Sequence, residues 1–327
     1  MRRSIPLVVT ALVLGLCGLA PAAGSAPNAV SPVAAVWTEP AAGYGFLDAA
    51  INGARRTIDL SMYELSDPVT EGDLAARARA GVDVRVLLNS AYDGQSENAA
   101  AATYLSHGGV HVAWAPASTI FHAKYLVVDG RAAYIGTGNL VNYDYSSTRD
   151  FWVEDTTPSD VAAISSTFAA DFAHESAAPV ASGGLVWSPG SATALVGLID
   201  GARYSLLVEN EEMDNSTIEQ SLIGAAERGV AVKVVMTYSS EWASALAQLE
   251  RAGVKVSTTS GSYLYIHAKV ICADCTATAG TVFIGSENFS TSSLWYNREL
   301  GVITTSLSAV RAVETAIDVD YAHGSTS

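Results

Sequence analysis

The chain contains its own sequence pattern twice. The segment GVDVRVLLN at 81–89 matches GVAVKVVMT at 229–237, and Gly-Ala-Arg at 53–55 matches Gly-Ala-Arg at 201–203, both at an offset of 148 residues. Further matches lie at offsets of 144 and 150, which short insertions explain. A pattern that recurs over this length predicts two halves with one common architecture.

The predicted boundaries follow from the repeat and from composition. Small residues, Pro and Gly fill 176–184 between the two copies, and such a stretch is typical of a linker. We place the N-terminal half at 27–178, the linker at 179–185 and the C-terminal half at 186–327.

Each copy alternates strand and helix patterns in the same order. In the N-terminal copy we expect strands at 57–63, 82–88 and 110–114 and helices at 71–80 and 96–106; in the C-terminal copy we expect strands at 205–208, 230–237 and 254–257 and helices at 218–228 and 241–252. Several of these strands are continuously apolar, which is typical of a sheet covered on both faces. The predicted fold class is α/β, with two pseudo-symmetric α-β-α sandwich halves.

The first 26 residues have the pattern of an export signal. Arg2 and Arg3 precede an apolar run at 5–19, and small residues follow it at 21–26. This order predicts a signal peptide at 1–26 and a secreted protein with no membrane span in the mature chain. A membrane anchor is one alternative, although about 15 apolar residues are short against the ~20 of a span. A lipoprotein at Cys17 is another, which the bulky residue before that cysteine disfavours.

Charge and cysteine content limit the partners. The sequence has 33 Asp and Glu against 18 Lys and Arg, which gives a net charge of −15. A chain this acidic does not provide the broad basic surface that supplies most nucleic-acid affinity.

Outside 1–26, Cys272 and Cys275 are the only cysteines, and in an oxidising compartment we expect them to pair. A zinc site would need a second ligand pair, and a redox motif would need a strand-to-helix context; the sequence shows neither.

A short motif follows the last of these strands in each half. It reads HAKYLVVD at 122–129 and HAKVICAD at 267–274. Each copy is followed by a Gly/Asn segment, GTGN or GSEN, and then by an Arg-acidic pair. Side chains at i and i+2 of an extended segment point to the same side, so each motif offers one imidazole and one ammonium group to a shared cleft.

These residue types fit the cleavage of a phosphodiester. The reaction needs a nucleophile for phosphorus, an acid for the departing alkoxide and cations for the non-bridging oxygens. Two imidazoles and two ammonium groups supply that set, so one motif makes half a site. A single His among apolar residues is more often a packed core residue. Here, however, a Lys follows the His by two positions in both motifs, which favours a functional site.

The double motif resembles the signature of the phospholipase D superfamily, HxKxxxxD followed by GSxN and an acidic residue, present twice per active site. The resemblance covers essentially all of the chain after residue 26. It implies one bilobal fold with the active site between the halves, a covalent phosphohistidine intermediate, and no metal or other cofactor. Two departures are visible: Thr137 stands where the family has Ser, and the turn from Asp274 to Gly285 is four residues longer than its counterpart from Asp129 to Gly136.

The resemblance also implies roles for individual residues. His122 is the expected nucleophile and His267 the expected general acid and base. The other expected roles are phosphate contact for Lys124, Lys269, Asn139 and Asn288, with Thr137 and Ser286 as supporting hydroxyls at the phosphate; hydrogen bonding to the histidines for Asp150 and Glu299; and turn structure for Asp129 and Asp274. The remaining histidines lie outside the two motifs and are expected to be surface or structural residues; they are His107, His111, His174 and His323.

Acidic residues also follow the first predicted strand of each half. They are Glu64 in one copy and Glu209, Glu211 and Glu212 in the other. Two interpretations stay open. These carboxylates could reach the cleft and favour a cationic head group such as choline, or they could be solvated loop charges.

We therefore expect an exported, monomeric phospholipase D that acts on glycerophospholipids at a membrane or vesicle surface. It would release the head-group alcohol and phosphatidic acid, with water or a small alcohol as acceptor. The alternatives are a secreted nuclease or other phosphodiesterase of the same family, a phosphatidyl-transferring synthase, for which we would expect membrane spans, and a catalytically silent binding module.

Overall fold

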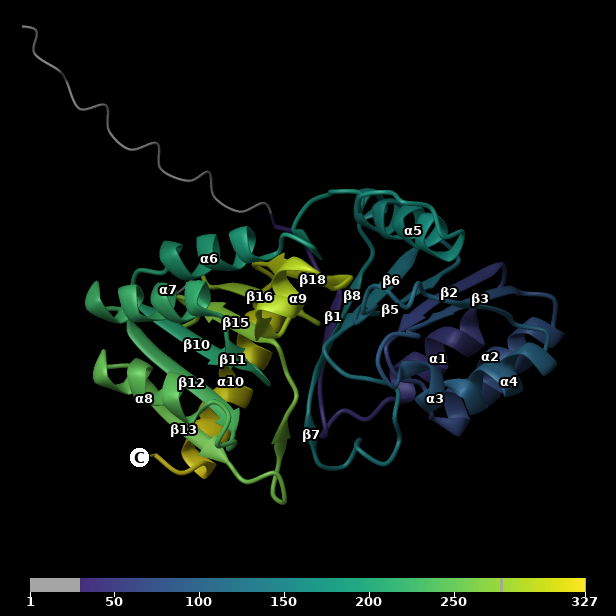
Figure 1. The fold of residues 1–327 in the computed structure, drawn as a ribbon. Helices are drawn as coiled ribbons and strands as arrows, with labels where there is room; N and C mark the ends of the chain where they lie inside the picture. The colour runs from purple at the N-terminus through teal and green to yellow at the C-terminus, as the bar shows by residue number, and fades with distance from the viewer. Residues whose placement is uncertain (1–29, 277–278, 327) are drawn as a thin grey trace, which may run out of the picture.

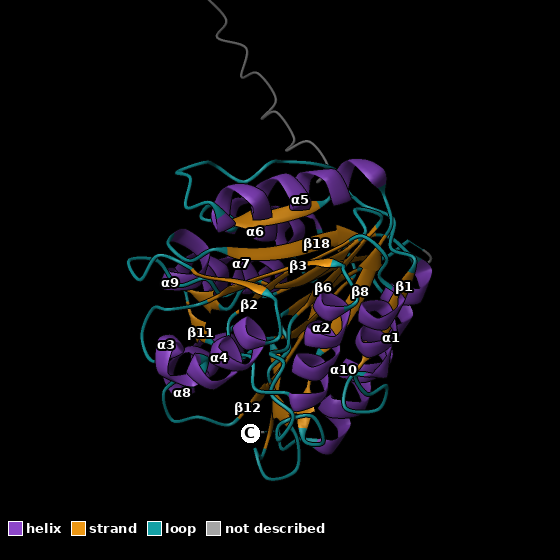
Figure 2. Cartoon of the chain, turned by 90° about the vertical axis from the view of Figure 1, so that its right-hand side faces the viewer, coloured by secondary structure: helices purple, strands orange, loops and turns teal. Residues whose placement is uncertain are grey.

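The computed structural model describes residues 30–276 and 279–326, which form two seven-stranded sheets with helices around them (Figures 1 and 2). The expected signal peptide at 1–26 lies outside the described residues. No helix among the described residues is long and apolar enough to cross a membrane.

The N-terminal half contains thirteen described elements, of which eight are strands. In chain order they are β1 (Ala35–Thr38), α1 (Gly45–Gly53), β2 (Thr57–Met62), α2 (Pro68–Arg79), β3 (Asp83–Leu88), α3 (Gly94–Glu97), α4 (Ala99–His107), β4 (His111–Trp114), β5 (Lys124–Val128), β6 (Ala132–Gly136), β7 (Thr148–Arg149), β8 (Phe151–Asp155) and α5 (Pro158–Phe172).

The C-terminal half repeats this order with small additions. Its described elements are β9 (Leu185–Ser188), α6 (Ala192–Gly201), β10 (Ser205–Glu209), β11 (Met213–Asp214), α7 (Ser216–Glu227), β12 (Ala231–Thr237), α8 (Ala243–Arg251), β13 (Lys255–Thr259), β14 (Tyr265–Ile266), β15 (Val270–Ala273), β16 (Thr281–Gly285), β17 (Phe289–Ser290), α9 (Thr291–Trp295), β18 (Glu299–Thr304) and α10 (Leu307–His323).

The two sheets have the same topology. The order is β1-β8-β6-β5-β2-β3-β4 in one and β9-β18-β16-β15-β10-β12-β13 in the other. Strands β2, β3 and β4 run parallel, as the predicted strand–helix alternation requires, whereas β5, β6, β8 and β1 add an antiparallel part. The predicted α/β class with two pseudo-symmetric halves is confirmed.

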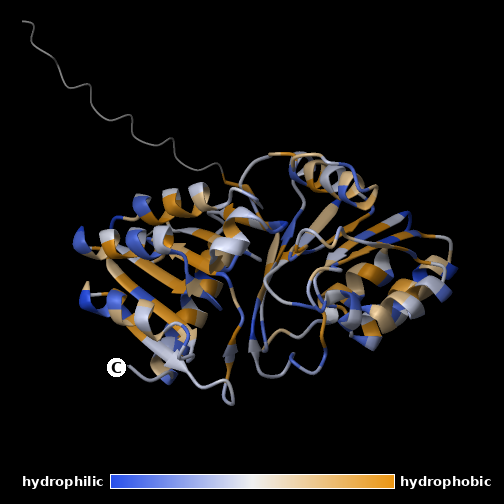
Figure 3. Cartoon of the chain, viewed as in Figure 1, coloured by the Kyte–Doolittle hydropathy of each residue, from blue (hydrophilic) through white to orange (hydrophobic). Residues whose placement is uncertain are grey.

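Three apolar cores hold the layers together. One lies between the N-terminal sheet and α1, α2 and α4, and another lies between the C-terminal sheet and α6, α7 and α8. The third joins residues of both sheets with α5 and α10. Strands contribute to two cores at once: Tyr125 and Val127 face the shared core, while Leu126 between them faces the outer one. Most of each strand is accordingly coloured as hydrophobic in Figure 3. The halves are joined by a common core.

Local signals in the repeat explain its element boundaries. Asp67 accepts hydrogen bonds from two backbone N–H groups at the start of α2, with Pro68 in the first helical turn, and Asn215 caps α7 in the same way. The helix predicted at 96–106 is divided into α3 and α4. The buried amide of Asn98, at the break, bonds the backbone of Tyr63, Leu65 and Asn89 and so ties this helix to the preceding loops.

The motif aspartates have the same structural position in both halves. Asp129 follows β5 with a φ of 54°, and its carboxylate accepts hydrogen bonds from the backbone N–H groups of residues 55, 56 and 57, which lead into β2. Asp274 has a φ of 55° and accepts those of residues 203, 204 and 205, which lead into β10. The arginine of each Gly-Ala-Arg repeat thus donates its backbone N–H to the motif aspartate of its half.

The predicted disulfide is confirmed. Cys272 lies in β15 and is bonded to Cys275, which starts the longer turn toward β16, with 5.7 Å between their Cα atoms. Both cysteines are buried.

Candidate active site

Backbone pairing between the halves positions both motif histidines. The N–H groups of His122 and Ala123 both donate to the carbonyl oxygen of Arg298 at 2.9 Å, beside an isolated bridge between Phe121 and Arg298. In the mirror arrangement β14 pairs with β7, and the N–H of His267 donates to the carbonyl oxygen of Arg149 at 3.2 Å. Each histidine therefore sits beside the Arg-acidic pair of the other half.

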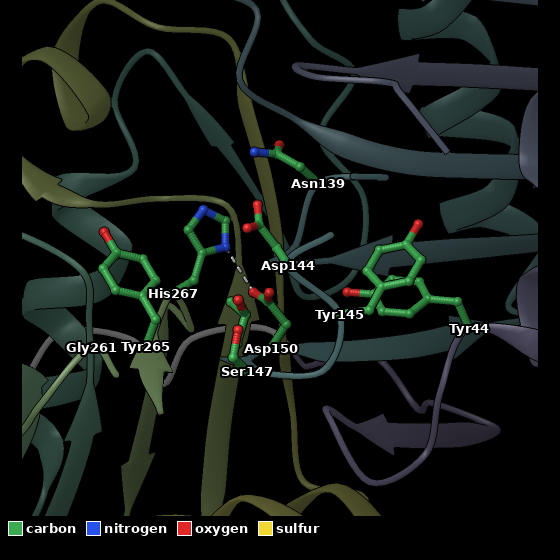
Figure 4. Close-up of a pocket in the computed structure, with 10 residues that line it drawn as sticks. Tyr44, Asn139, Asp144, Tyr145, Ser147, Asp150, Gly261, Tyr265 and His267 are labelled. Carbon is green, nitrogen blue, oxygen red and sulfur yellow. Dashed lines mark hydrogen bonds and ion pairs between the residues drawn. The ribbon is translucent and has the colours of Figure 1, made fainter. Parts of the chain in front are cut away.

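The histidine side chains also contact the acidic residue of the opposite half. Nδ1 of His122 lies 2.9 Å from Oε2 of Glu299, and Nδ1 of His267 lies 2.9 Å from Oδ1 of Asp150 (Figure 4). All four side chains are at most 12% exposed. A carboxylate at Nδ1 fixes the ring orientation and keeps a proton on that nitrogen, so Nε2 is the atom left for chemistry.

Each carboxylate is held in turn by the hydroxyl of its own half. Thr137 donates to Oδ1 of Asp150 at 2.5 Å, and Ser286 donates to Oε2 of Glu299 at 2.6 Å. Both hydroxyl residues are fully buried. The sequence suggested that these hydroxyls support the phosphate, and the structure places them behind the carboxylates instead. The reason is sheet geometry, because Gly136 pairs with Trp152 and the next residue, Thr137, therefore lies beside the strand that follows Asp150.

Glu299 is ionised by its surroundings. Its other oxygen accepts hydrogen bonds from Ser293 at 2.7 Å and from Asn297 at 3.1 Å. Burial raises the pKa of Glu299, but His122, Lys124 and Ser286 outweigh it and bring the pKa below its ordinary value.

The two motif lysines are buried and fold back over their own motifs. Nζ of Lys124 donates to the carbonyl oxygen of His122 at 2.6 Å, and Nζ of Lys269 donates to that of His267. Both side chains are completely buried. Burial and the charge of Lys269 lower the pKa of Lys124 to about 7. The two halves of the site therefore act on each other electrostatically.

The acidic residues that follow the first strands lie in the cleft. Nδ2 of Asn139 is 3.5 Å from Oε2 of Glu64, and Nδ2 of Asn288 is 2.9 Å from Oε1 of Glu212. Glu211 is 2.9 Å from the ammonium group of Lys269. Of the two interpretations left open by the sequence, solvated loop charges do not describe Glu64, Glu211 and Glu212, which contact motif residues. Glu209 is fully buried and faces Asp320 and Arg149.

Cavities open on both sides of the histidines. One of about 350 Å³ lies beside His267 and is lined by Tyr44, Tyr145, Tyr265 and Asp144 among others (Figure 4). Another of about 440 Å³ lies beside His122 and is lined by Tyr63, Tyr92, Trp242, Glu212 and Glu241 among others. Both walls combine aromatic rings with carboxylates.

Two ion pairs at the interface were not predicted. Arg149 makes a two-pronged contact with Asp320 of α10, at 2.6 and 2.9 Å, and Arg298 contacts Asp171 of α5 at 3.0 Å. Each arginine again reaches a helix of the other half. The signal was present in the sequence, because the arginines and the aspartates are both separated by 149 residues.

Within residues 30–276 and 279–326, no group of three or more His, Cys, Asp or Glu side chains is arranged to hold a metal ion.

The family model described as "Cardiolipin synthase, PLD-like domain" matches residues 47–174 and 195–321, once in each half. No curated protein matches the sequence. Among solved structures, phosphatidylserine synthase from Haemophilus influenzae Rd KW20 has 12% identity, a TM-score of 0.68, and coverage of 93% of this chain and 90% of its own. Polyphosphate kinase from Porphyromonas gingivalis has 16% identity, a TM-score of 0.67 and coverage of 88% of this chain; this chain spans half of that protein's length.

A member of the phospholipase D family, Nuc from Salmonella typhimurium, is 22% identical and covers 44% of this chain and 95% of its own, with a TM-score of 0.40. At these identities the first two structures establish a common fold.

Proposed function

Because the chain belongs to the family of phospholipase D-like domains described for cardiolipin synthase, we propose that it is a phospholipase D-type phosphodiesterase. The observation that carries the proposal is the pair of imidazoles whose Nδ1 atoms are both held by carboxylates of the opposite half. This arrangement leaves two Nε2 atoms beside two buried ammonium groups, as a two-step displacement at phosphorus requires.

The proposed reaction has two steps. Nε2 of His122 attacks phosphorus and forms a P–N bond while His267 gives a proton to the departing alkoxide. Water or an alcohol then attacks the same phosphorus, loses a proton to His267 and releases His122. Lys124, Lys269, Asn139 and Asn288 hold the non-bridging oxygens throughout.

Lipid is the proposed substrate class, with a glycerophospholipid cleaved to phosphatidic acid and its head-group alcohol. The carboxylates of Glu64, Glu211 and Glu212 contact the motif Asn and Lys side chains, and the chain carries a net charge of −15. Such a surface repels a long polyanion and tolerates a monoanionic diester with a cationic head group. The leader-like segment at 1–26 supports export, so the lipid would be met outside the cytoplasm.

A parallel assay tests this proposal. The protein without residues 1–26 is incubated with phosphatidylcholine and phosphatidylethanolamine vesicles and, separately, with single- and double-stranded DNA. We expect phosphatidic acid from the vesicles, and phosphatidylethanol when ethanol is added. Degradation of DNA with untouched lipid would make the protein a nuclease, and no cleavage of either would favour a binding module.

A further inference from the structure

The two halves of the site differ at one position in the loop after the first strand of each half. At the repeat offset of 148 residues, Glu64 corresponds to Glu212, and each contacts the motif asparagine of its half. The position just before them holds Tyr63 in the N-terminal half and Glu211 in the C-terminal half. An aromatic ring therefore stands beside one histidine and a carboxylate beside the other.

Glu211 is fixed next to the reactive nitrogen of His267. Its Oε2 lies 2.9 Å from Nζ of Lys269 and 3.6 Å from Nε2 of His267, and its Oε1 accepts a hydrogen bond from the Tyr265 hydroxyl at 2.7 Å. Burial raises the pKa of Glu211, but Lys269, His267 and Tyr265 outweigh it and lower the pKa below its ordinary value. With Asp150 at Nδ1, His267 has a carboxyl group near each ring nitrogen.

His122 has different neighbours. The ring of Tyr63 meets the His122 ring edge-on, with 4.6 Å between the centroids and 69° between the planes, and its face lies 5.1 Å from Nζ of Lys124. Within the described part of the chain, Glu299 at Nδ1 is the only carboxylate within 4.0 Å of this imidazole. Burial lowers the pKa of His122 to about 4, so its Nε2 carries a free lone pair at neutral pH.

These surroundings favour different protonation states. A carboxylate near Nε2 stabilises the imidazolium, which is the form that can give a proton away, whereas a neutral imidazole is the form that attacks phosphorus. We propose that Glu211 holds the proton on Nε2 of His267 and so makes that histidine the acid of the first step. Tyr63 leaves His122 uncharged for attack. This inference rests on the proposed phosphodiesterase function, and Glu211 is a positioning residue because it acts through His267.

The ammonium group of Lys269 can serve both Glu211 and the substrate. Of its three N–H groups, one donates to the His267 carbonyl and one to Glu211, which leaves one for a phosphate oxygen. Lys124 donates to the His122 carbonyl and has two left.

Other titratable groups lie around Glu211 and His267, so the variants must be compared at the same pH. The titratable groups that face the pair from the surrounding elements are Lys124, Lys269, Tyr63, Tyr265, Asp144, Asp150, Glu64 and Glu212.

The decisive variant is Glu211→Gln, which removes the charge and keeps an acceptor for Tyr265. It is compared with the unaltered protein on short-chain phosphatidylcholine and on the p-nitrophenyl ester of the same phosphatidic acid. Choline leaves as an alkoxide that needs an acid, and p-nitrophenolate does not. General acids contribute ~10²–10⁴-fold, so we expect a loss of ~10-fold or more on phosphatidylcholine and less than ~3-fold in the p-nitrophenol burst.

A spectroscopic readout follows the proton itself. In the ¹⁵N-histidine-labelled protein, the Nε2 signal of His267, assigned by its absence in His267→Gln, should change in Glu211→Gln, because the carboxylate 3.6 Å from that nitrogen is replaced by a neutral amide. The matched control is Glu97→Gln, which removes an exposed carboxylate near the cleft and should keep both the substrate ratio and the ring signals.

Failure of this inference differs from failure of the proposed function. If the unaltered protein cleaves neither ester, the phosphodiesterase proposal is wrong. If the unaltered protein cleaves both esters, two results would contradict the role of Glu211. In one, Glu211→Gln loses activity on both esters equally; in the other, it loses activity on neither. In either case the proposed function stands and Glu211 does not control the proton of His267.

Discussion

Nδ1 of His122, in the N-terminal half, lies 2.9 Å from Oε2 of Glu299, in the C-terminal half. In the same way, Nδ1 of His267, in the C-terminal half, lies 2.9 Å from Oδ1 of Asp150, in the N-terminal half. Neither half therefore contains a histidine together with its own orienting carboxylate. This arrangement exists only where the two sheets meet, and the core that they share contains the residues on either side of both histidines, which are Phe121, Ala123, Ile266 and Ala268.

Removing the charge of an orienting carboxylate should reduce turnover more than substrate binding. In Glu299→Gln the amide can donate to Nδ1 of His122 and move the proton to Nε2, which removes the attacking lone pair. We expect kcat on phosphatidylcholine to fall ~10²–10⁴-fold with KM changed less than ~3-fold. Ser286→Ala, which removes one hydrogen bond to the same carboxylate, should lose far less. A rise in KM at unchanged kcat in Glu299→Gln would mean that the carboxylate serves binding.

The pH dependence of kcat/KM should reflect His122 and Lys124. The pKa of His122 is lowered to about 4, so the proposed nucleophile becomes neutral as the pH rises through that value. The pKa of Lys124 is lowered to about 7, so above that pH the free protein loses a cation that we propose contacts the phosphate. On the p-nitrophenyl ester, which needs no acid, kcat/KM should rise near pH 4 and fall above about pH 7.

Lys124→Arg separates the two limbs of that profile. Arginine keeps its charge at every pH of the assay, so the fall above pH 7 should move to higher pH while the rise near pH 4 stays. A fall that stays near pH 7 in this variant would assign that limb to another group.

The ion pair between the halves should matter for stability. Arg149 and Asp320 are 10% and 3% exposed, and Asp320→Asn leaves the buried guanidinium without its anion. Loss of one partner of a buried pair costs ~3–5 kcal/mol of unfolding free energy. Asp318→Asn on the same helix is the control, because Asp318 and Lys233 are 48% and 32% exposed and such a pair contributes ~1 kcal/mol or less. Equal effects of the two variants in urea unfolding would contradict this assignment.

The repeat and the motifs made much of this structure predictable. The parallel strands β2, β3 and β4 were expected because apolar runs alternate with helical patterns, and the disulfide was expected because its two cysteines are three residues apart in a chain expected to be exported. The sequence does not predict the antiparallel part of each sheet, since its short strands surround the motifs and carry no periodic pattern of their own.

The exchange of partners between the halves could not be read from the sequence. Asp150 follows His122 in the chain by 28 residues, yet it binds His267, because β7 pairs with β14 across the interface. A two-residue pairing of this kind has no local sequence signal. The hydroxyl of Thr137 illustrates the same limit: its residue type was informative, but the direction of its side chain depends on the neighbouring strand.

Trapping of the covalent intermediate tests the central claim most directly. In His267→Ala the p-nitrophenyl ester should still react once, because its leaving group needs no acid, and the intermediate should persist because the base for water is missing. Mass spectrometry of the quenched, digested protein should then find the phosphatidyl group on the peptide that contains His122, and none in His122→Ala. An adduct on any other residue, or release of p-nitrophenol in His122→Ala, would contradict the assignment of His122 as the nucleophile of a site shared by both halves.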